Sequence, residues 1–213
     1  MNILVAGYPR SGSTRLYNII RLILLQKHSF DEMYCCWYDY FDEAKAKKIN
    51  IVKLHYYEEK WLGWADLIFT TKRDLRYVAA SCLEFNARRG RVYGDEVLLD
   101  FLNSVMAMYE GWGLHSTYQL VYENCEKNLL REIFNLSQIL GIENTNCEQI
   151  MTDLAAIRKK SIDSDVPFDW NTLMNRHHVS DKNSLHYSQR LSANQTKLIN
   201  DIYGGWLKEN GYI

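Results

Sequence analysis

The sequence predicts an α/β protein in which a parallel β-sheet is flanked by helices on both faces. Short apolar runs alternate along the chain with longer segments of helical periodicity. Strands that alternate with helices form parallel sheets, because each helix returns the chain to the start of the next strand. Pro9 and Pro167 are the only prolines, so the helices can run without interruption.

Four short runs are predicted as the strands of this sheet. They are apolar or β-branched, which is typical of strands that are buried on both faces. The runs span residues 3–6, 49–54, 67–71 and 119–122. Ligands of such sheets bind beyond the carboxyl ends of the strands, so the residues that follow each run are the first candidates for a site.

Apolar residues recur at helical spacing in six further segments, which are predicted as helices. These segments are 16–25, 74–85, 98–112, 129–140, 150–157 and 192–206. The first is apolar nearly all round, so we expect it to be buried against the sheet. Gly141 follows the fourth as a glycine C-cap, and Ser192 with Gln195 forms a capping box that opens the last.

Composition favours one ordinary globular domain over residues 1–213. The chain is 47% hydrophobic with a net charge of −1, which argues against a dedicated nucleic-acid binder. Its five cysteines lack C-x-x-C spacing, as expected for thiols in a reducing compartment. The apolar stretch 22–25 is too short to span a bilayer, and no charged leader precedes the first strand. We therefore expect a soluble cytoplasmic protein with no membrane span.

The loop between the first strand and the first helix has the sequence of an anion-binding site. Gly7 ends the strand, Arg10 lies within the loop, and Gly12 precedes Ser13 and Thr14 at the start of the helix. Backbone N–H groups in a first helical turn have no intrahelical partner, and the helix dipole adds partial positive charge there. The loop is predicted to bind a phosphate-like group; the alternative is a tight turn with no ligand.

This loop differs from the nucleotide P-loop, G-x-x-x-x-G-K-[ST], at the position of the lysine. Gly7 and Gly12 have the P-loop spacing and Thr14 supplies the hydroxyl, but Ser13 stands where the lysine would be. No acidic residue at a strand end offers a magnesium ligand, so we expect no metal. The sequence thus predicts a single-domain, P-loop-like parallel sheet whose loop binds less negative charge than a triphosphate.

Two further strand ends carry candidate functional residues. Arg73 follows the third strand and Ser81 lies two turns along the next helix, where a guanidinium and a hydroxyl together suit a terminal phosphate. Asp74 is expected to cap that helix. Lys53 and His55 lie on one side of the second strand's end, where the imidazole suits a general base. Alone, each would indicate only a surface salt bridge or a core-edge histidine.

Four segments together resemble the PAPS-dependent sulfotransferases. Residues 8–16, Tyr-Pro-Arg-Ser-Gly-Ser-Thr-Arg-Leu, are similar to the family's 5′-phosphosulfate loop, commonly Tyr-Pro-Lys-Ser-Gly-Thr-Thr-Trp-Leu. Residues 72–81 resemble its 3′-phosphate site, with an arginine and a serine eight residues apart. Residues 53–55 are similar to its Lys-Thr-His and residues 121–124 to its Tyr-Glu-Asp segment. Order and approximate spacing agree across residues 2–140.

The resemblance implies transfer of a sulfuryl group from PAPS to a hydroxyl or amine of a small-molecule or carbohydrate acceptor. It implies that His55 is the general base and that Lys53 and Arg10 stabilise charge on the leaving oxygen. The residues it implies for binding PAPS are Arg10, Ser11, Gly12, Ser13, Thr14, Arg15, Arg73, Ser81 and Tyr122, the last near adenine.

The sequence also departs from that family. Arg10 replaces the loop lysine, and Arg15 replaces the loop aromatic, as in the carbohydrate-modifying branch. The late Arg-Lys-Gly motif is not visible; residues 176–180, Arg-His-His-Val-Ser, are a candidate substitute within the aperiodic segment 162–191, which is predicted as a lid. Two alternatives stay open: a P-loop kinase that uses ATP, and a noncatalytic nucleotide-binding protein.

An aromatic run follows the first predicted helix. It comprises Tyr34, Trp37, Tyr38, Tyr40 and Phe41, and it is interpreted either as the lining of an acceptor pocket or as core packing.

Overall fold

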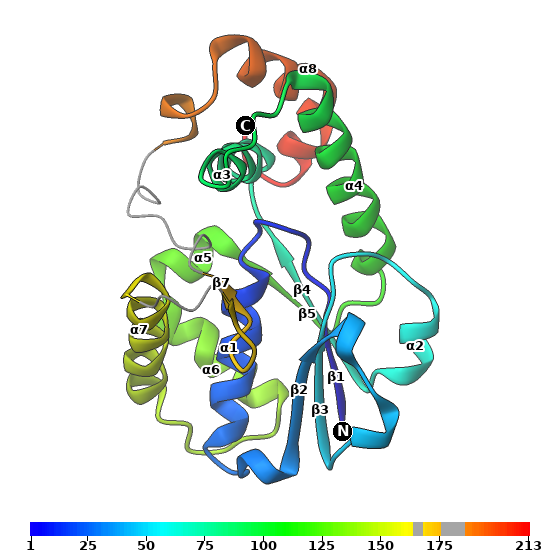
Figure 1. The fold of residues 1–213 in the computed structure, drawn as a ribbon, viewed down its shortest axis with the longest axis vertical. Helices are drawn as coiled ribbons and strands as arrows, with labels where there is room; N and C mark the ends of the chain where they lie inside the picture. The colour runs from blue at the N-terminus through cyan, green and yellow to red at the C-terminus, as the bar shows by residue number, and fades with distance from the viewer. Residues whose placement is uncertain (164–167, 176–185) are drawn as a thin grey trace.

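A five-stranded parallel sheet forms the centre of the protein (Figure 1). The structure, a computed structural model, describes residues 1–163, 168–175 and 186–213. The strand order is β2-β3-β1-β4-β5, and every neighbouring pair is parallel. The strands are β1 (Asn2–Val5), β2 (Met33–Trp37), β3 (Ile49–Lys53), β4 (Leu67–Lys72) and β5 (Tyr118–Val121).

Helices cover both faces of the sheet, as the alternating pattern predicts. The α-helices among the described residues are α1 (Ser13–Leu25), α2 (Lys60–Trp64), α3 (Leu75–Ala87), α4 (Asp95–Gly113), α5 (Tyr122–Lys127), α6 (Leu129–Ile139), α7 (Cys147–Asp163) and α8 (Ala193–Glu209). The capping box at Ser192 is confirmed, and Gly141 has the positive φ of a glycine C-cap.

Alternation along β1 separates two buried clusters. Leu4 and Ala6 face a cluster that includes residues of α3, α4 and α8, whereas Ile3 and Val5 face α1 and α6. Successive side chains of a strand point to opposite faces, so this one strand contributes to both halves of the core. Burying both faces explains why the strands read as nearly continuous apolar runs.

Strand β2 was not among the predicted strands. It pairs with β3 from Met33↔Ile49 to Trp37↔Lys53 and forms one edge of the sheet. Its sequence, Met-Tyr-Cys-Cys-Trp, contains aromatic residues that favour strands but no β-branched residue, and the pairing with β3 identifies it as a strand. The aromatic run divides here: Trp37 and Tyr40 line a cavity, while Tyr34, Tyr38 and Phe41 pack against the core.

The segment predicted as a lid is only partly described. Its described parts include the end of α7, the antiparallel pair β6 (Phe168–Asp169) and β7 (Met174–Asn175), and a 3₁₀ turn at Tyr187–Gln189. Residues 176–180, including His177 and His178, lie outside the described residues, so their predicted role stays a prediction.

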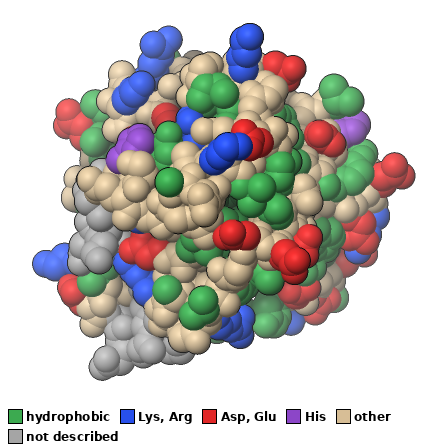
Figure 2. All heavy atoms as spheres, turned by 90° about the horizontal axis from the view of Figure 1, so that it is seen from above, with side chains coloured by type: hydrophobic (Ala, Val, Ile, Leu, Met, Phe, Trp, Pro, Cys, Tyr) green, Lys and Arg blue, Asp and Glu red, His purple; other side chains and the backbone are tan. Residues whose placement is uncertain are grey.

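The surface seen in Figure 2 mixes acidic, basic and apolar side chains, without one extended patch of either charge. No helix within the described part of the chain is long and apolar enough to cross a bilayer.

Candidate functional site

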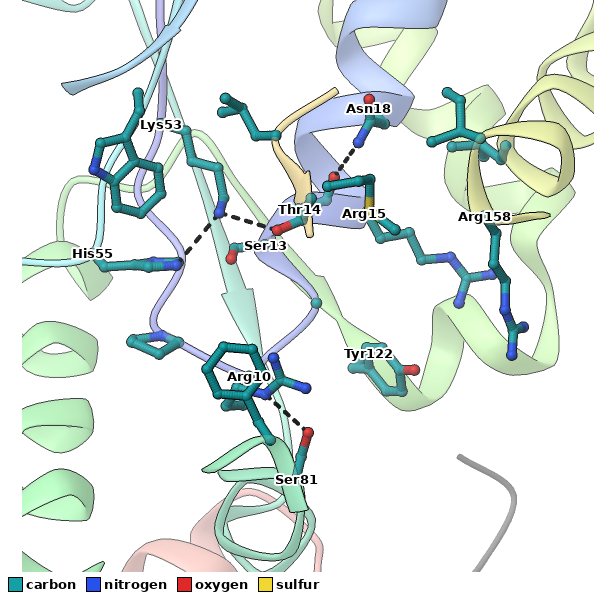
Figure 3. A pocket seen from close by; sticks show the side chains of 18 of the residues that line it. Arg10, Ser13, Thr14, Arg15, Asn18, Lys53, His55, Ser81, Tyr122 and Arg158 are labelled. Carbon is teal, nitrogen blue, oxygen red and sulfur yellow. Dashed lines mark hydrogen bonds between the residues drawn. The ribbon is translucent and has the colours of Figure 1, made fainter. Parts of the chain in front are cut away.

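A cavity of about 850 Å³ opens at the carboxyl ends of β1, β3 and β4 (Figure 3). This is the edge of a parallel sheet where a ligand is expected. Every catalytic or PAPS-binding residue predicted from the sequence lines this cavity except Ser11. The chain thus brings residues from positions 9 to 174 to one site.

Two glycines of the first loop stand where a side chain would collide with neighbours. A Cβ on Gly7 would lie 2.4 Å from Thr71 Oγ1 and 2.6 Å from Ser13 Cβ. Gly12 has a φ of +94°, and a Cβ there would lie 2.5 Å from the Tyr122 ring. The loop can fold against β4 and α5 because these two positions have no side chain.

The start of α1 is an open anion cradle. Its N-cap is Gly12, which has no side chain to cap the first turn. Thr14 Oγ1 accepts a hydrogen bond from Lys53 Nζ at 3.1 Å, which joins the cradle to the end of β3. Uncapped backbone N–H groups together with the helix dipole favour a bound anion.

Ser11 supports the loop instead of lining the cavity. It is fully buried; its hydroxyl donates to the Tyr8 carbonyl at 2.6 Å and is also hydrogen-bonded to Thr71 Oγ1. Its backbone N–H points to the same Tyr8 carbonyl at 3.4 Å. The hydroxyl therefore fastens the loop to β4, and its predicted contact with a ligand is untested.

Arg10 has a strained backbone that its side chain helps to hold. Its φ is +66°, a conformation that residues other than glycine seldom adopt. Its Nε donates to Ser81 Oγ at 3.0 Å, and its guanidinium lies 4.7 Å from the centre of the Phe85 ring. Burial, together with the charge of Arg73, lowers the pKa of Arg10 to about 10.

Arg73 is held by both backbone and ring contacts. The backbone N–H of Arg73 donates to the Tyr8 hydroxyl at 2.7 Å, and that hydroxyl lies 3.1 Å from the backbone carbonyl of Arg73. Its Nη1 donates to the Arg10 carbonyl at 2.9 Å, and the guanidinium lies 4.0 Å from the centre of the Tyr122 ring. Its Nε is buried with no hydrogen-bond partner among the described residues.

Arg73 and Ser81, which the sequence predicts to bind one phosphate together, are not hydrogen-bonded to each other in the structure. The Ser81 hydroxyl accepts from Arg10 Nε instead, and all three side chains line the same cavity. Sequence spacing placed both residues at the same site but could not show which guanidinium reaches the serine. The predicted cap is confirmed, because the Asp74 carboxylate accepts from the Arg76 N–H.

Lys53 and His55 meet beside Trp37. Lys53 Nζ lies 3.4 Å from His55 Nε2 and 4.6 Å from the centre of the Trp37 ring. His55 Nδ1 is hydrogen-bonded to the Gly7 carbonyl, which can only accept, so Nδ1 carries the proton and Nε2 offers the lone pair. Burial, with a smaller contribution from the charge of Arg10, lowers the pKa of Lys53 to about 7.

The far end of the cavity surrounds Tyr122, the first residue of α5. Arg15 forms an ion pair with Glu126 there. Arg158 of α7 also lines this end, and Figure 3 shows its side chain pointing toward it. Sequence reasoning missed Glu126 and Arg158, because neither belongs to a motif and helix α7 has only a weak apolar pattern.

Two walls of the cavity contrast in chemistry. The cation wall consists of the cradle at Gly12–Thr14 with Arg10, Lys53 and Arg73, and the aromatic wall consists of Trp37, Tyr40, Phe168 and Trp170. Tyr40 and Trp170 pack edge to face with ring centres 4.7 Å apart, although each is 57% exposed. Two exposed aromatic rings at a cavity mouth are typical of a binding surface.

Comparison with solved structures identifies the fold. A mouse sulfotransferase (SULT7A1) complexed with PAP superposes with a TM-score of 0.68 at 14% identity, over 97% of this chain and 84% of that one. Retinol dehydratase with retinol and PAP gives a TM-score of 0.63 at 17% identity, over 98% and 80%. Retinol dehydratase with androsterone and PAP gives 0.61 at 15%, again over 98% and 80%. The chain has the sulfotransferase fold. No family model and no curated protein matches the sequence.

The sulfotransferase fold confirms the predicted fold class. At such low sequence identity, the shared fold does not assign roles to individual residues. Those roles have to be argued from the geometry of the site. Among the described residues, no group of three or more His, Cys, Asp or Glu side chains could hold a metal ion.

Proposed function

We propose that the protein transfers a sulfuryl group from PAPS to a hydroxyl or amine of a small acceptor. The observation that carries the proposal is Arg73, a residue that lines the same cavity as the open cradle of α1 and whose buried Nε has no partner among the described residues. A buried guanidinium N–H without an acceptor is costly, so an anion is the natural partner. Two anion sites in one cavity suit a nucleotide with phosphate groups at two positions.

The residues fit PAPS in the order that the sequence resemblance implies. The cradle at Gly12–Thr14, with Arg10 and Lys53, would hold the phosphosulfate, and Arg73 with Ser81 would hold the 3′-phosphate. Tyr122 and Arg15 would lie toward the adenine. When bound, PAPS supplies the sulfuryl group. The solved structures of the same fold were determined with PAP, which supports this nucleotide as the ligand.

His55 is proposed to remove the proton from the acceptor. Its Nδ1–H is fixed by the Gly7 carbonyl, so Nε2 can receive a proton at the cavity surface. Arg10 places positive charge close by, where negative charge grows on the leaving oxygen, and Lys53, whose pKa is lowered to about 7, adds its charge when it is protonated. Fixed cations and backbone N–H groups would stabilise this charge without rearranging during transfer.

The first acceptors to test are small apolar molecules that carry a hydroxyl. Androsterone and retinol are bound in two of the structures with this fold. The aromatic wall begins at Trp37, whose ring lies 4.8 Å from that of His55 at a steep angle. An acceptor held against these rings would present its hydroxyl to His55. Amines and carbohydrates remain further acceptors to assay.

Calorimetric titration with adenosine 3′,5′-bisphosphate tests the proposal. We expect binding by the wild type, and a loss of about 1.5–3 kcal/mol in the Arg73→Ala variant, since a charged hydrogen-bond partner is removed. Arg91→Ala is the matched control, because Arg91 is exposed and does not line the cavity.

The two alternative functions, a kinase that uses ATP and a noncatalytic nucleotide-binding protein, predict different results in binding and release assays. ATP with magnesium should bind no more tightly than the bisphosphate, whereas a kinase would show the reverse order. A noncatalytic protein would bind the bisphosphate but release none from PAPS with any acceptor. Unchanged affinity after Arg73→Ala would contradict the proposed anion site.

A further inference from the structure

An ion pair in the cavity includes an acidic residue, Glu126, that has no part in the chemistry described so far. Arg15, in the first turn of α1, pairs with Glu126 of α5, which is 111 residues away in the chain. Both side chains line the cavity, and Arg15 lies one residue beyond the cradle at Gly12–Thr14. The pair therefore lies directly beside the cradle that is proposed to hold the phosphosulfate.

The same end of the cavity has an incompletely covered apolar surface. In α7, which has 17 residues, Ile150 is the only buried one. Met151 and Leu154 lie three positions apart, so they share one side of this helix; they are half-buried and line the cavity with Leu129. A flat aromatic group would complete the burial of these side chains.

Tyr122 connects this end to the second anion site. The Arg73 guanidinium lies over its ring, and in Figure 3 Tyr122 lies between the Arg10–Ser81 pair and the side chains of Arg15 and Arg158. A nucleotide held at Arg73 and the cradle would thus extend its base toward Arg15 and Glu126.

We propose that the Arg15–Glu126 pair recognises the edge of the adenine base. The carboxylate only accepts hydrogen bonds and the guanidinium only donates them. Adenine presents its 6-amino donor beside a ring nitrogen acceptor, so Glu126 accepts from the amino group and Arg15 donates to the ring nitrogen. The apolar side chains of Leu129, Met151 and Leu154 pack against the base. This inference rests on the proposed function.

The contribution of this recognition is expected to be moderate. The Arg15 and Glu126 side chains are 29% and 52% exposed, so water competes for both. Removing the 6-amino group should weaken binding about tenfold, at the low end of the range for a hydrogen bond to a charged group.

A double-mutant cycle between protein and ligand tests the inference. Calorimetry compares adenosine 3′,5′-bisphosphate with its analogue that has hydrogen in place of the 6-amino group, for the wild type and Glu126→Ala. The wild type should prefer the adenosine compound about tenfold, and Glu126→Ala should bind both equally. Glu126→Gln, which retains an acceptor oxygen, should keep part of the preference.

The control is Glu148→Ala, which removes an exposed acid of α7 outside the cavity and should keep the full preference. Equal binding of the two ligands by the wild type, or an unchanged preference in Glu126→Ala, overturns the inference and leaves the proposed function intact. If neither ligand binds the wild type, the proposed function fails, and the inference fails with it.

Discussion

The two walls of the cavity differ in how the chain constructs them. The cation wall arises where strands pass directly into helices, and its side chains are interlocked: Arg73 bonds to Arg10, Arg10 to Ser81, and Lys53 to Thr14. The aromatic wall joins the end of β2 and the segment after it to the β6–β7 hairpin through ring contacts, as between Tyr40 and Trp170.

We infer from this difference that the two walls bind different ligands. Interlocked hydrogen bonds fix donors in place, which suits a ligand of constant charge and shape. Ring contacts between exposed side chains can rearrange at little cost, which suits a less defined apolar acceptor. We therefore expect changes in the cation wall to affect nucleotide binding and chemistry, and changes in the aromatic wall to affect only the acceptor.

The largest effect is expected at the junction of the two walls. His55→Ala should lower kcat about 100- to 10,000-fold, the range for loss of a general base. Affinity for adenosine 3′,5′-bisphosphate should stay near that of the wild type. The measurement is bisphosphate release from PAPS across a panel of phenols, amines and sugars. Near-normal turnover would show that His55 is not the base.

A second test addresses the rigidity of the cation wall. Gly12→Ala should destabilise the protein by about 1–3 kcal/mol, because it combines a positive φ with a collision against Tyr122. Urea unfolding measures this. Gly90→Ala is the matched control, since Gly90 also has a positive φ, +71°, but has open space around it. Equal losses in the two variants would mean that the Tyr122 contact is unimportant.

A third test uses the charge of Lys53. Its pKa is lowered from 10.5 to about 7, so between these values the unfolded chain holds a proton that the folded protein has lost. The free energy of unfolding therefore gains a contribution that rises with pH above about 7 and is constant below it.

Lys53→Met should remove that rise, measured by urea unfolding at about pH 6, 7.5 and 9. Lys159→Met, which removes an exposed lysine of α7, should retain the pH dependence of the wild type. If the curves of Lys53→Met and the wild type run parallel, Lys53 is charged in the folded protein throughout this range.

The smallest effect is expected in the aromatic wall. Trp170→Ala removes ring contacts with Tyr40 and Phe168 and should raise the KM of an aromatic acceptor about 3- to 10-fold, as loss of an aromatic contact predicts. Bisphosphate affinity should not change. A large loss of bisphosphate affinity would show that the two walls are not separate in function.

Local sequence predicted most of the fold and much of the candidate site. Alternation of apolar strands and amphipathic helices identified four of the five strands of the main sheet, and the glycines of the first loop identified the cradle. Strand β2 was missed because its identity depends on pairing with β3. Glu126 and Arg158 were missed because they reach the cavity only through the packing of α5 and α7.

The sequence by itself determined the α/β architecture, because this follows from local periodicity. It also determined that the first loop turns tightly at Gly7 and Gly12, because these residues have no Cβ. Tertiary structure alone decided that Arg10 bonds to Ser81, that Ser11 turns into the core, and that Arg15 meets Glu126. The physical reason is that each of these contacts joins side chains whose meeting depends on how separate elements pack, which no local pattern encodes.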